Sequence, residues 1–99
     1  LNSWSESSCL RGGVYTVDIS DPKNPSQRGF IPALPGNYHG EGAHVIEAET
    51  KSFSGDLLAV NNEFCVDSPT VGGGFDLYDV TDPSNPKKLS TNFGDSRRM

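Results

Sequence analysis

Short segments of this chain alternate apolar with polar residues, and glycine, proline, aspartate or asparagine bounds each of them. The segments are rich in β-branched and aromatic side chains, which favour extended strands. No window places apolar residues at the i, i+3, i+4, i+7 spacing of an amphipathic helix, so very little helix is expected. The expected strands cover residues 14–19, 44–49, 57–64, 75–80 and 87–92. The pattern therefore predicts an all-β fold.

One stretch of the chain occurs twice, at an offset of 61 residues. Residues 12–25 are GGVYTVDISDPKNP and residues 73–86 are GGFDLYDVTDPSNP, so half of the aligned positions are identical. Residues 1–4 precede the first copy much as residues 60–63 precede the second. The chain therefore holds one complete repeat unit and most of another.

Each copy ends in Asp-Pro-x-Asn-Pro, which predicts a sharp reversal of the chain. Proline presets φ at the second place of a type I turn, and the aspartate before it can accept backbone N–H bonds. Because these polar residues recur in both copies, we expect them to satisfy turn amides, and calcium binding is the alternative. The residues assigned to these structural turns are Asp18, Asp21, Pro22, Asn24, Asp79, Asp82, Pro83 and Asn85.

Four successive expected strands in the second unit predict a four-stranded antiparallel sheet, the form of one β-propeller blade. On this interpretation residues 1–30 supply the later strands of a partial blade and residues 31–42 an inter-blade loop. Residues 43–95 then form a complete blade, and residues 96–99 form a tail. A blade has two apolar faces that only neighbouring blades can cover, and closed propellers carry four to eight blades. We therefore expect this chain to be a partial propeller, which either is a fragment of a larger propeller or completes its ring by assembling with copies of itself or with other segments.

The repeated strand and turn resemble the LVIVD repeat, which forms β-propellers in bacterial and archaeal proteins that are often secreted or surface-attached. Residues 14–18 and 75–79 carry the resemblance, each followed by Ile/Val-Ser/Thr-Asp-Pro-x-Asn-Pro. The repeat spacing is longer than is usual for that family, and the extra residues fall in segments 31–42 and 65–72. The resemblance implies propeller architecture and an extracytoplasmic location. It implies no activity, because the family is defined by architecture.

The charge and hydropathy of the chain exclude two classes of partner. A net charge of −5 and a pI near 4.7 argue against nucleic acid as a partner, because polyanion binding relies on basic residues. The longest apolar run, residues 57–60, is far shorter than the ~20 residues that a membrane span requires. We therefore expect neither nucleic-acid binding nor a membrane span.

The side chains with metal-ligand chemistry cluster in the sequence His-x-Glu-x-x-His, formed by His39, Glu41 and His44. Imidazole and carboxylate together suit zinc, iron or manganese, so a divalent metal is the one cofactor considered. The histidines are five positions apart and flanked by glycines, unlike the helical zinc motif H-E-x-x-H. Ordinary loop histidines bonded to water or backbone are the alternative. In a propeller of the resembled kind this segment would lie near the mouth of the central channel.

The two cysteines, Cys9 and Cys65, lack the CxxC or Cys/His spacing of zinc and thioredoxin-type sites. They form either a disulfide or two unpaired thiols. Residues 72–74 are three glycines, but they lack the Lys-Ser/Thr of a phosphate-binding loop. Cys65 has no local signature of a catalytic cysteine either, so no catalytic residue is assigned.

These observations favour a non-catalytic propeller module that serves interaction or scaffolding in a secreted or surface protein. Its partners would be the remaining propeller blades, other copies of the chain, or a protein or ligand that the sequence does not identify. The alternative is a metal-binding or enzymatic propeller with a site at the channel mouth, formed by His39, Glu41 and His44.

Overall fold

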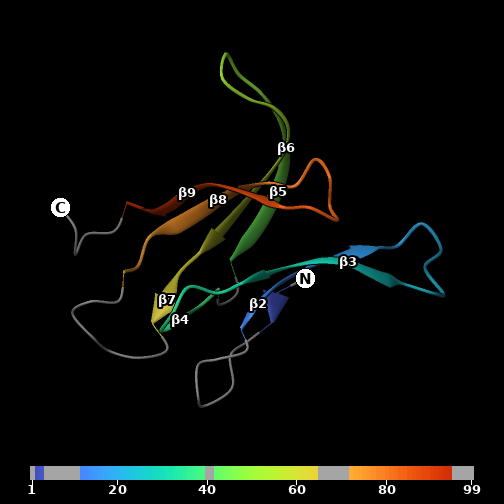
Figure 1. Ribbon diagram of the computed structural model, residues 1–99, viewed down its shortest axis with the longest axis horizontal. Helices are drawn as coiled ribbons and strands as arrows, with labels where there is room; N and C mark the ends of the chain where they lie inside the picture. The colour runs from blue at the N-terminus through green and yellow to red at the C-terminus, as the bar shows by residue number, and fades with distance from the viewer. Residues whose placement is uncertain (1, 4–11, 40–41, 65–71, 95–99) are drawn as a thin grey trace.

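The computed structural model of the chain describes residues 2–3, 12–39, 42–64 and 72–94, and every regular element in these ranges is a strand (Figure 1). The prediction of an all-β fold is therefore confirmed. No helix among these residues is long and apolar enough to cross a membrane. The strands are β1 (Asn2–Ser3), β2 (Gly13–Asp18), β3 (Ser26–Pro32), β4 (Asn37–Tyr38), β5 (Ala43–Glu49), β6 (Ser54–Asn61), β7 (Glu63–Phe64), β8 (Phe75–Asp79) and β9 (Lys87–Phe93).

The strands form three antiparallel sheets. The first sheet has the order β1-β2-β3, the second sheet has the order β5-β6-β8-β9, and a two-stranded pair joins β4 to β7. In Figure 1 the first sheet (blue to teal) lies on one side of β5 and β6 (green), while β8 and β9 (orange to red) lie on the other. The second sheet is a meander in which neighbours along the chain are neighbours in space, as the four-strand pattern of the sequence indicates.

The two sequence repeats share much of their strand register and one irregularity, while the second sheet has a further irregularity between Phe75 and Leu77. Arg28 is an extra residue in β3 opposite β2, and Leu89, which lies 61 positions later, is an extra residue in β9 opposite β8. A β-bulge of this kind increases the local twist of the sheet. The short β1 also pairs with β2 as β6 pairs with β8. The equivalent pairs are Asn2–Val14 and Asn61–Phe75, Thr16–Gly29 and Leu77–Ser90, Val17–Gln27 and Tyr78–Lys88, and Asp18–Ser26 and Asp79–Lys87.

The turns that follow β2 and β8 share one set of hydrogen bonds. In each turn two aspartate carboxylates accept the amide two residues later, and a backbone bond closes the reversal, so these side chains satisfy turn amides. The equivalent bonds are Ser20 N to Asp18 Oδ1 (2.9 Å) and Thr81 N to Asp79 Oδ1 (2.9 Å), Lys23 N to Asp21 Oδ1 (3.2 Å) and Ser84 N to Asp82 Oδ1 (3.0 Å), and Asn24 N to Asp21 O (3.0 Å) and Asn85 N to Asp82 O (3.0 Å).

Hydrogen bonds at these turns also lower two pKa values. Arg28 Nη2 donates to Asp18 Oδ2 at 2.8 Å and holds the pKa of that carboxyl well below its usual range. Asp79 accepts from the Thr81 hydroxyl at 2.6 Å, and this bond lowers its pKa as well. Both carboxylates therefore stay ionised, and in this state they accept the hydrogen bonds of the turn amides.

The first sheet packs face to face against the second and forms the core between them. Six apolar or aromatic side chains are buried there: Val14 and Ile31 from the first sheet, and Leu58, Val60, Tyr78 and Val80 from the second or its end. The sheets also meet at the second turn, where the Thr16 hydroxyl donates to the carbonyl oxygen of Pro83. A Cβ on Gly29 would lie 2.7 Å from that same oxygen, so glycine permits the close approach.

The structure differs from the sequence prediction around residues 31–64. The segment 31–42, expected to be a loop, contains the end of β3 and all of β4. The strand expected over 57–64 is two strands, because the chain changes partners at Asn62, from β5 and β8 to β4. β6 also begins earlier than expected, at Ser54, since Thr50 Oγ1 accepts the amides of Ser52 and Phe53 and closes a shorter hairpin.

Replacement of Gly29 by alanine tests the contact between the sheets. The added Cβ would press on the Pro83 carbonyl oxygen at 2.7 Å and on Thr16 Oγ1 at 3.0 Å. We expect Gly29→Ala to lower the free energy of unfolding by about 1–3 kcal/mol, measured by urea denaturation followed by circular dichroism. The matched control is Ser90→Ala at the equivalent position of the second sheet, with an expected change within about 0.5 kcal/mol. Equal stability of the two variants would contradict the close approach.

Candidate functional site

Four polar side chains are buried where β4 and β7 meet the end of the second sheet. They are Asn37 at 2% exposure, His39 at 0%, Asn62 at 6% and Asp76 at 0%, and they are called the polar cluster below. Carboxylates are almost never fully buried unless they are paired. Only six apolar or aromatic side chains are buried among the described residues, so four buried polar side chains form a large share of the interior. Such a share requires an explanation.

The strand register places the members of the cluster. Asp76 lies on β8 and shares the core-facing side with Tyr78, because side chains two positions apart point to the same face. Asn62 lies between β6 and β7, and its backbone amide donates to Gly74 O at 2.8 Å. His39 directly follows β4. Three segments far apart in sequence thus meet at one end of the sheet.

Asn37 has a structural role. Its Nδ2 donates to Glu63 O at 3.1 Å and to Gly72 O at 2.8 Å, which ties β4 to β7 and to the segment before β8. The Nδ2 of Asn92 donates in the same way to Gly73 O at 2.8 Å. These side-chain amides donate hydrogen bonds to backbone carbonyl oxygens where the sheet ends.

Asp76 accepts hydrogen bonds through one of its two oxygens. Oδ1 accepts from Asn62 Nδ2 at 2.7 Å and from the backbone amide of Asn92 at 2.9 Å. Oδ2 has no hydrogen-bond partner, and neither does Oδ1 of Asn62. The carboxylate is thus held in place on one side and left unpartnered on the other.

The imidazole of His39 is held in one tautomer. Its Nδ1 lies 3.3 Å from Asn61 O, and because a carbonyl oxygen only accepts, Nδ1 carries the proton. Nε2 then carries a lone pair, and it is buried without a partner. Burial lowers the pKa of His39 from 6.5, against the opposing effects of the Asn61 carbonyl and the negative charge of Asp76. The ring is therefore neutral at physiological pH.

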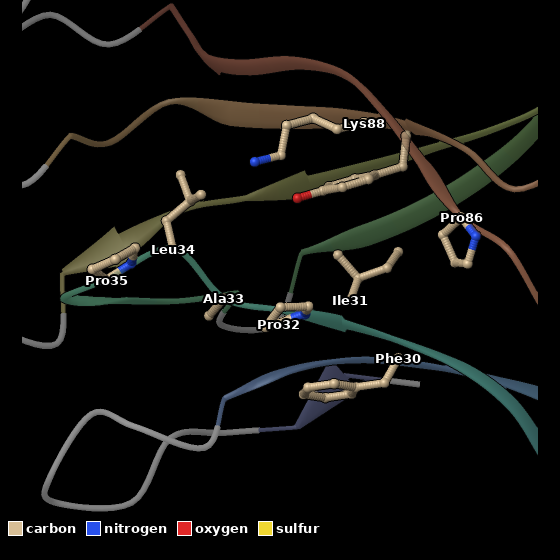
Figure 2. A pocket seen from close by; sticks show the side chains of 9 residues that line it. Phe30, Ile31, Pro32, Ala33, Leu34, Pro35, Pro86 and Lys88 are labelled. Atoms are coloured by element: carbon tan, nitrogen blue, oxygen red, sulfur yellow. The ribbon is translucent and has the colours of Figure 1, made fainter.

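Tyr78 lies on the same face as Asp76 and stays protonated. Burial, the neighbouring charge of Asp76 and a hydrogen bond to that carboxylate raise the pKa of its hydroxyl to about 12. Tyr78 also lines an apolar groove of about 340 Å³ between β3 and β9. Figure 2 shows Ile31 and Pro32 on the β3 wall of this groove and Pro86 and Lys88 on the opposite wall. The seam between the two sheets is thus tight at the Gly29–Pro83 contact and open toward this groove.

The metal-ligand residues predicted from sequence are placed only in part. His39 belongs to the polar cluster, whereas His44 is exposed on β5 and pairs with Ala59, on the face opposite Asp76. Glu41, Cys9 and Cys65 lie outside the described residues, so the metal triplet and the disulfide stay predictions. The residues that the structure describes hold no group of three or more histidines, cysteines, aspartates or glutamates that could bind a metal ion.

Sequence analysis missed Asp76 and Asn62. A signal for Asp76 was present, because it alternates with Tyr78 and Val80 and therefore occupies a core-facing position of a strand. No comparable signal exists for Asn62, since its approach to Asp76 depends on where β6 ends.

The pH dependence of stability tests the burial of His39. As pH falls below about 6.5, the unfolded chain binds a proton that folded His39 resists, so the free energy of unfolding decreases, by at most about 1.4 kcal/mol per pH unit. We expect urea titrations in EDTA between pH 8 and pH 5.5 to show this decrease. His39→Gln should flatten it. Identical slopes in the wild type and His39→Gln would show that His39 titrates freely.

Comparisons with protein-family models, with curated proteins and with solved structures give no match for this chain. The two repeat units within the chain offer a comparison of their own. By register, Tyr15 of the first unit is equivalent to Asp76 of the second, and Ser3 is equivalent to Asn62. The turn aspartates recur in both units, but the buried carboxylate does not. The repeat fold by itself therefore does not require Asp76.

Proposed function

We propose that this chain is a non-catalytic interaction or scaffold module made of propeller-type repeat units, and that its open sheet face binds a further unit of the same repeat. The observation that carries the proposal is the unequal burial of the two faces of the second sheet. The face toward the first sheet contains Leu58, Val60, Asp76 and Tyr78, all of which are buried.

The opposite face of the second sheet carries apolar side chains beside His44, Asp79, Lys87 and Ser90, and none of these apolar side chains is buried. Ile46 is 47% exposed and Phe93 is 62% exposed, and the phenyl rings of Phe75 and Phe93 contact each other with centroids 5.2 Å apart. The apolar members of this open face are Ile46, Leu57, Ala59, Phe75, Leu77 and Phe93. Exposed apolar side chains gathered on one sheet face favour a partner.

The internal repeat indicates what that partner is. The first sheet covers the second with the side of β2 that carries Val14 and Thr16, and the equivalents of these residues are Phe75 and Leu77. The second sheet thus presents on its open face the strand positions by which the first sheet makes its contact. A further unit placed on this face would repeat an interface that the chain already forms.

The first sheet presents the matching surface. Tyr15 and Val17 lie on the side of β2 that faces away from the second sheet, and they are equivalent to Asp76 and Tyr78, which the first sheet covers. The two open faces therefore differ and complement each other in a head-to-tail manner. Interfaces of this kind close into rings when the rotation per unit permits, as in a propeller.

The further unit belongs either to the same longer protein or to another copy of this chain. The resemblance of the repeat to the LVIVD repeat supports propeller architecture and, with it, an extracytoplasmic location. The alternative function, a metal-binding or enzymatic propeller, finds support in the buried, unpartnered Nε2 of His39. The structure gives His39 no neighbour from the predicted triplet among the described residues, because His44 is exposed on β5.

The extracytoplasmic location predicts oxidised cysteines. Protein purified without reductant and then unfolded should show no free thiol in a titration with Ellman's reagent, because disulfides persist in oxidising compartments. Reduction before unfolding is the control and should release two thiols, from Cys9 and Cys65. Two free thiols without reduction would argue against an oxidised pair.

Complementary variants test the head-to-tail association. We expect the 99-residue chain to self-associate in sedimentation velocity, and a lysine on either open face to prevent this: Leu77→Lys on the second sheet or Val17→Lys on the first. Each variant retains one intact face, so an equimolar mixture of the two should recover a heterodimer. Ser52→Lys, at the exposed hairpin between β5 and β6, is the control and should associate like the wild type.

A two-fold interface would give a different result. If two copies met through the open face of the second sheet in each, Val17→Lys would still dimerise alone, and mixing it with Leu77→Lys would add nothing. A wild type that stays monomeric at all concentrations would overturn association between copies and leave the same-chain unit to be tested with a longer protein that contains flanking repeats.

A further inference from the structure

Three atoms of the polar cluster are buried without a hydrogen-bond partner: His39 Nε2, Asn62 Oδ1 and Asp76 Oδ2. All three carry lone pairs and none carries a hydrogen. The tautomer of His39 follows from its contact with Asn61 O, and the amide orientation of Asn62 follows from the bond that its Nδ2 donates to Asp76. The protonated hydroxyl of Tyr78 forms a hydrogen bond with Asp76, and among the described residues His39 Nε2 and Asn62 Oδ1 remain without a donor. Several buried acceptors gathered around one carboxylate are the chemistry of a cation site.

The contacts bring the three side chains to the same place. Asn62 and Asp76 are hydrogen-bonded to each other at 2.7 Å. The carbonyl of the residue before Asn62 holds the His39 ring, and the negative charge of Asp76 is close enough to favour the protonated imidazole. The unpartnered atoms therefore belong to one cluster and not to separate defects.

Among the described residues, the groups that contact Asp76 carry no positive charge. Two neutral amides donate to Oδ1, the hydroxyl of Tyr78 forms a hydrogen bond with the carboxylate, and the neighbouring imidazole is neutral. A buried carboxylate without a positively charged neighbour is a place where a cation can bind favourably. The first repeat unit has Tyr15 at the equivalent position, which indicates that Asp76 serves a purpose other than the fold.

We propose that His39 Nε2, Asn62 Oδ1 and Asp76 Oδ2 bind one divalent metal ion of intermediate character, such as Mn²⁺, Fe²⁺ or Zn²⁺. One nitrogen and two oxygens form a mixed donor set, because imidazole suits the later transition metals and carboxylate or carbonyl oxygen suits Mn²⁺. The contact between Nδ1 of His39 and the Asn61 carbonyl is the outer-shell bond that metal-binding histidines usually make. The charge of the ion would compensate the carboxylate.

This site differs from the triplet that the sequence suggests, since it shares only His39 with it. His44 lies on the other face of the sheet, so it is a matched control histidine in the same protein. The ligands come from three segments: the residue after β4, the β6–β7 junction and β8. Metal binding would therefore tie together the part of the fold where the chain changes strand partners.

The test uses the full 99-residue chain stripped of metal with a chelator and titrated separately with MnCl₂ and ZnCl₂ by isothermal calorimetry. We expect one ion per chain and a melting temperature that rises with metal and falls with EDTA. Asp76→Asn keeps the hydrogen-bond geometry but removes the charge, and His39→Gln removes the nitrogen ligand. Each should weaken binding at least about 10-fold, whereas His44→Gln should bind like the wild type.

A second measurement requires no variant in the cluster and therefore does not depend on whether those variants fold. In ¹⁵N-labelled wild type, Zn²⁺ should shift the Nε2 resonance of His39 and leave both nitrogens of His44 in place. The proposal is overturned if neither metal binds, if His44 shifts instead of His39, or if His44→Gln weakens binding as much as His39→Gln.

Discussion

The fold depends on the stacking of one sheet on the face of another. A single four-stranded sheet with apolar residues on both faces cannot remove them from water by itself, and here the first sheet covers only one face of the second. The contact is close where Gly29 admits the Pro83 carbonyl, and it buries Val14 and Ile31 against the second sheet. Because hydrophobic burial is roughly proportional to area, the uncovered face represents stability that the chain does not gain alone.

The same constraint explains why the repeat and the open faces belong together. Two units related head to tail always leave one face of each kind uncovered, whatever the details of the side chains. The largely shared register and the shared bulge at Arg28 and Leu89 show that the units are similar in geometry, which favours repetition of one interface. A repeat array gains its stability from such neighbour contacts, which is why a pair of units exposes more apolar surface per unit than a longer array.

The features that could be predicted from sequence are those that local chemistry decides. Strand-forming segments and the Asp-Pro-x-Asn-Pro turns follow from residue preferences over five or six positions, and the turn bonds of Asp18 and Asp79 follow from their place beside the turn amides. The split of the expected strand at Asn62 could not be predicted, because it depends on a change of partner strand. The meeting of His39 with Asp76 depends on that same change, and no spacing in the sequence encodes it.

The polar cluster and the open face represent opposite solutions to the limited core of a small β domain. At Tyr15 the first unit keeps a large amphipathic side chain, whose ring contacts that of Phe30 with centroids 4.7 Å apart, and this contact stabilises the sheet without any ligand. In the second unit a buried carboxylate takes this position, and the proposed cation would compensate its charge. The second sheet is also irregular at this point, between Phe75 and Leu77, where the first sheet is regular. The two units thus differ where the polar cluster lies. A fold whose stability depends on a bound ion at one unit and on a neighbouring unit at the other face would be fully formed only when both are present. That dependence is suited to a module whose role is to assemble with other units.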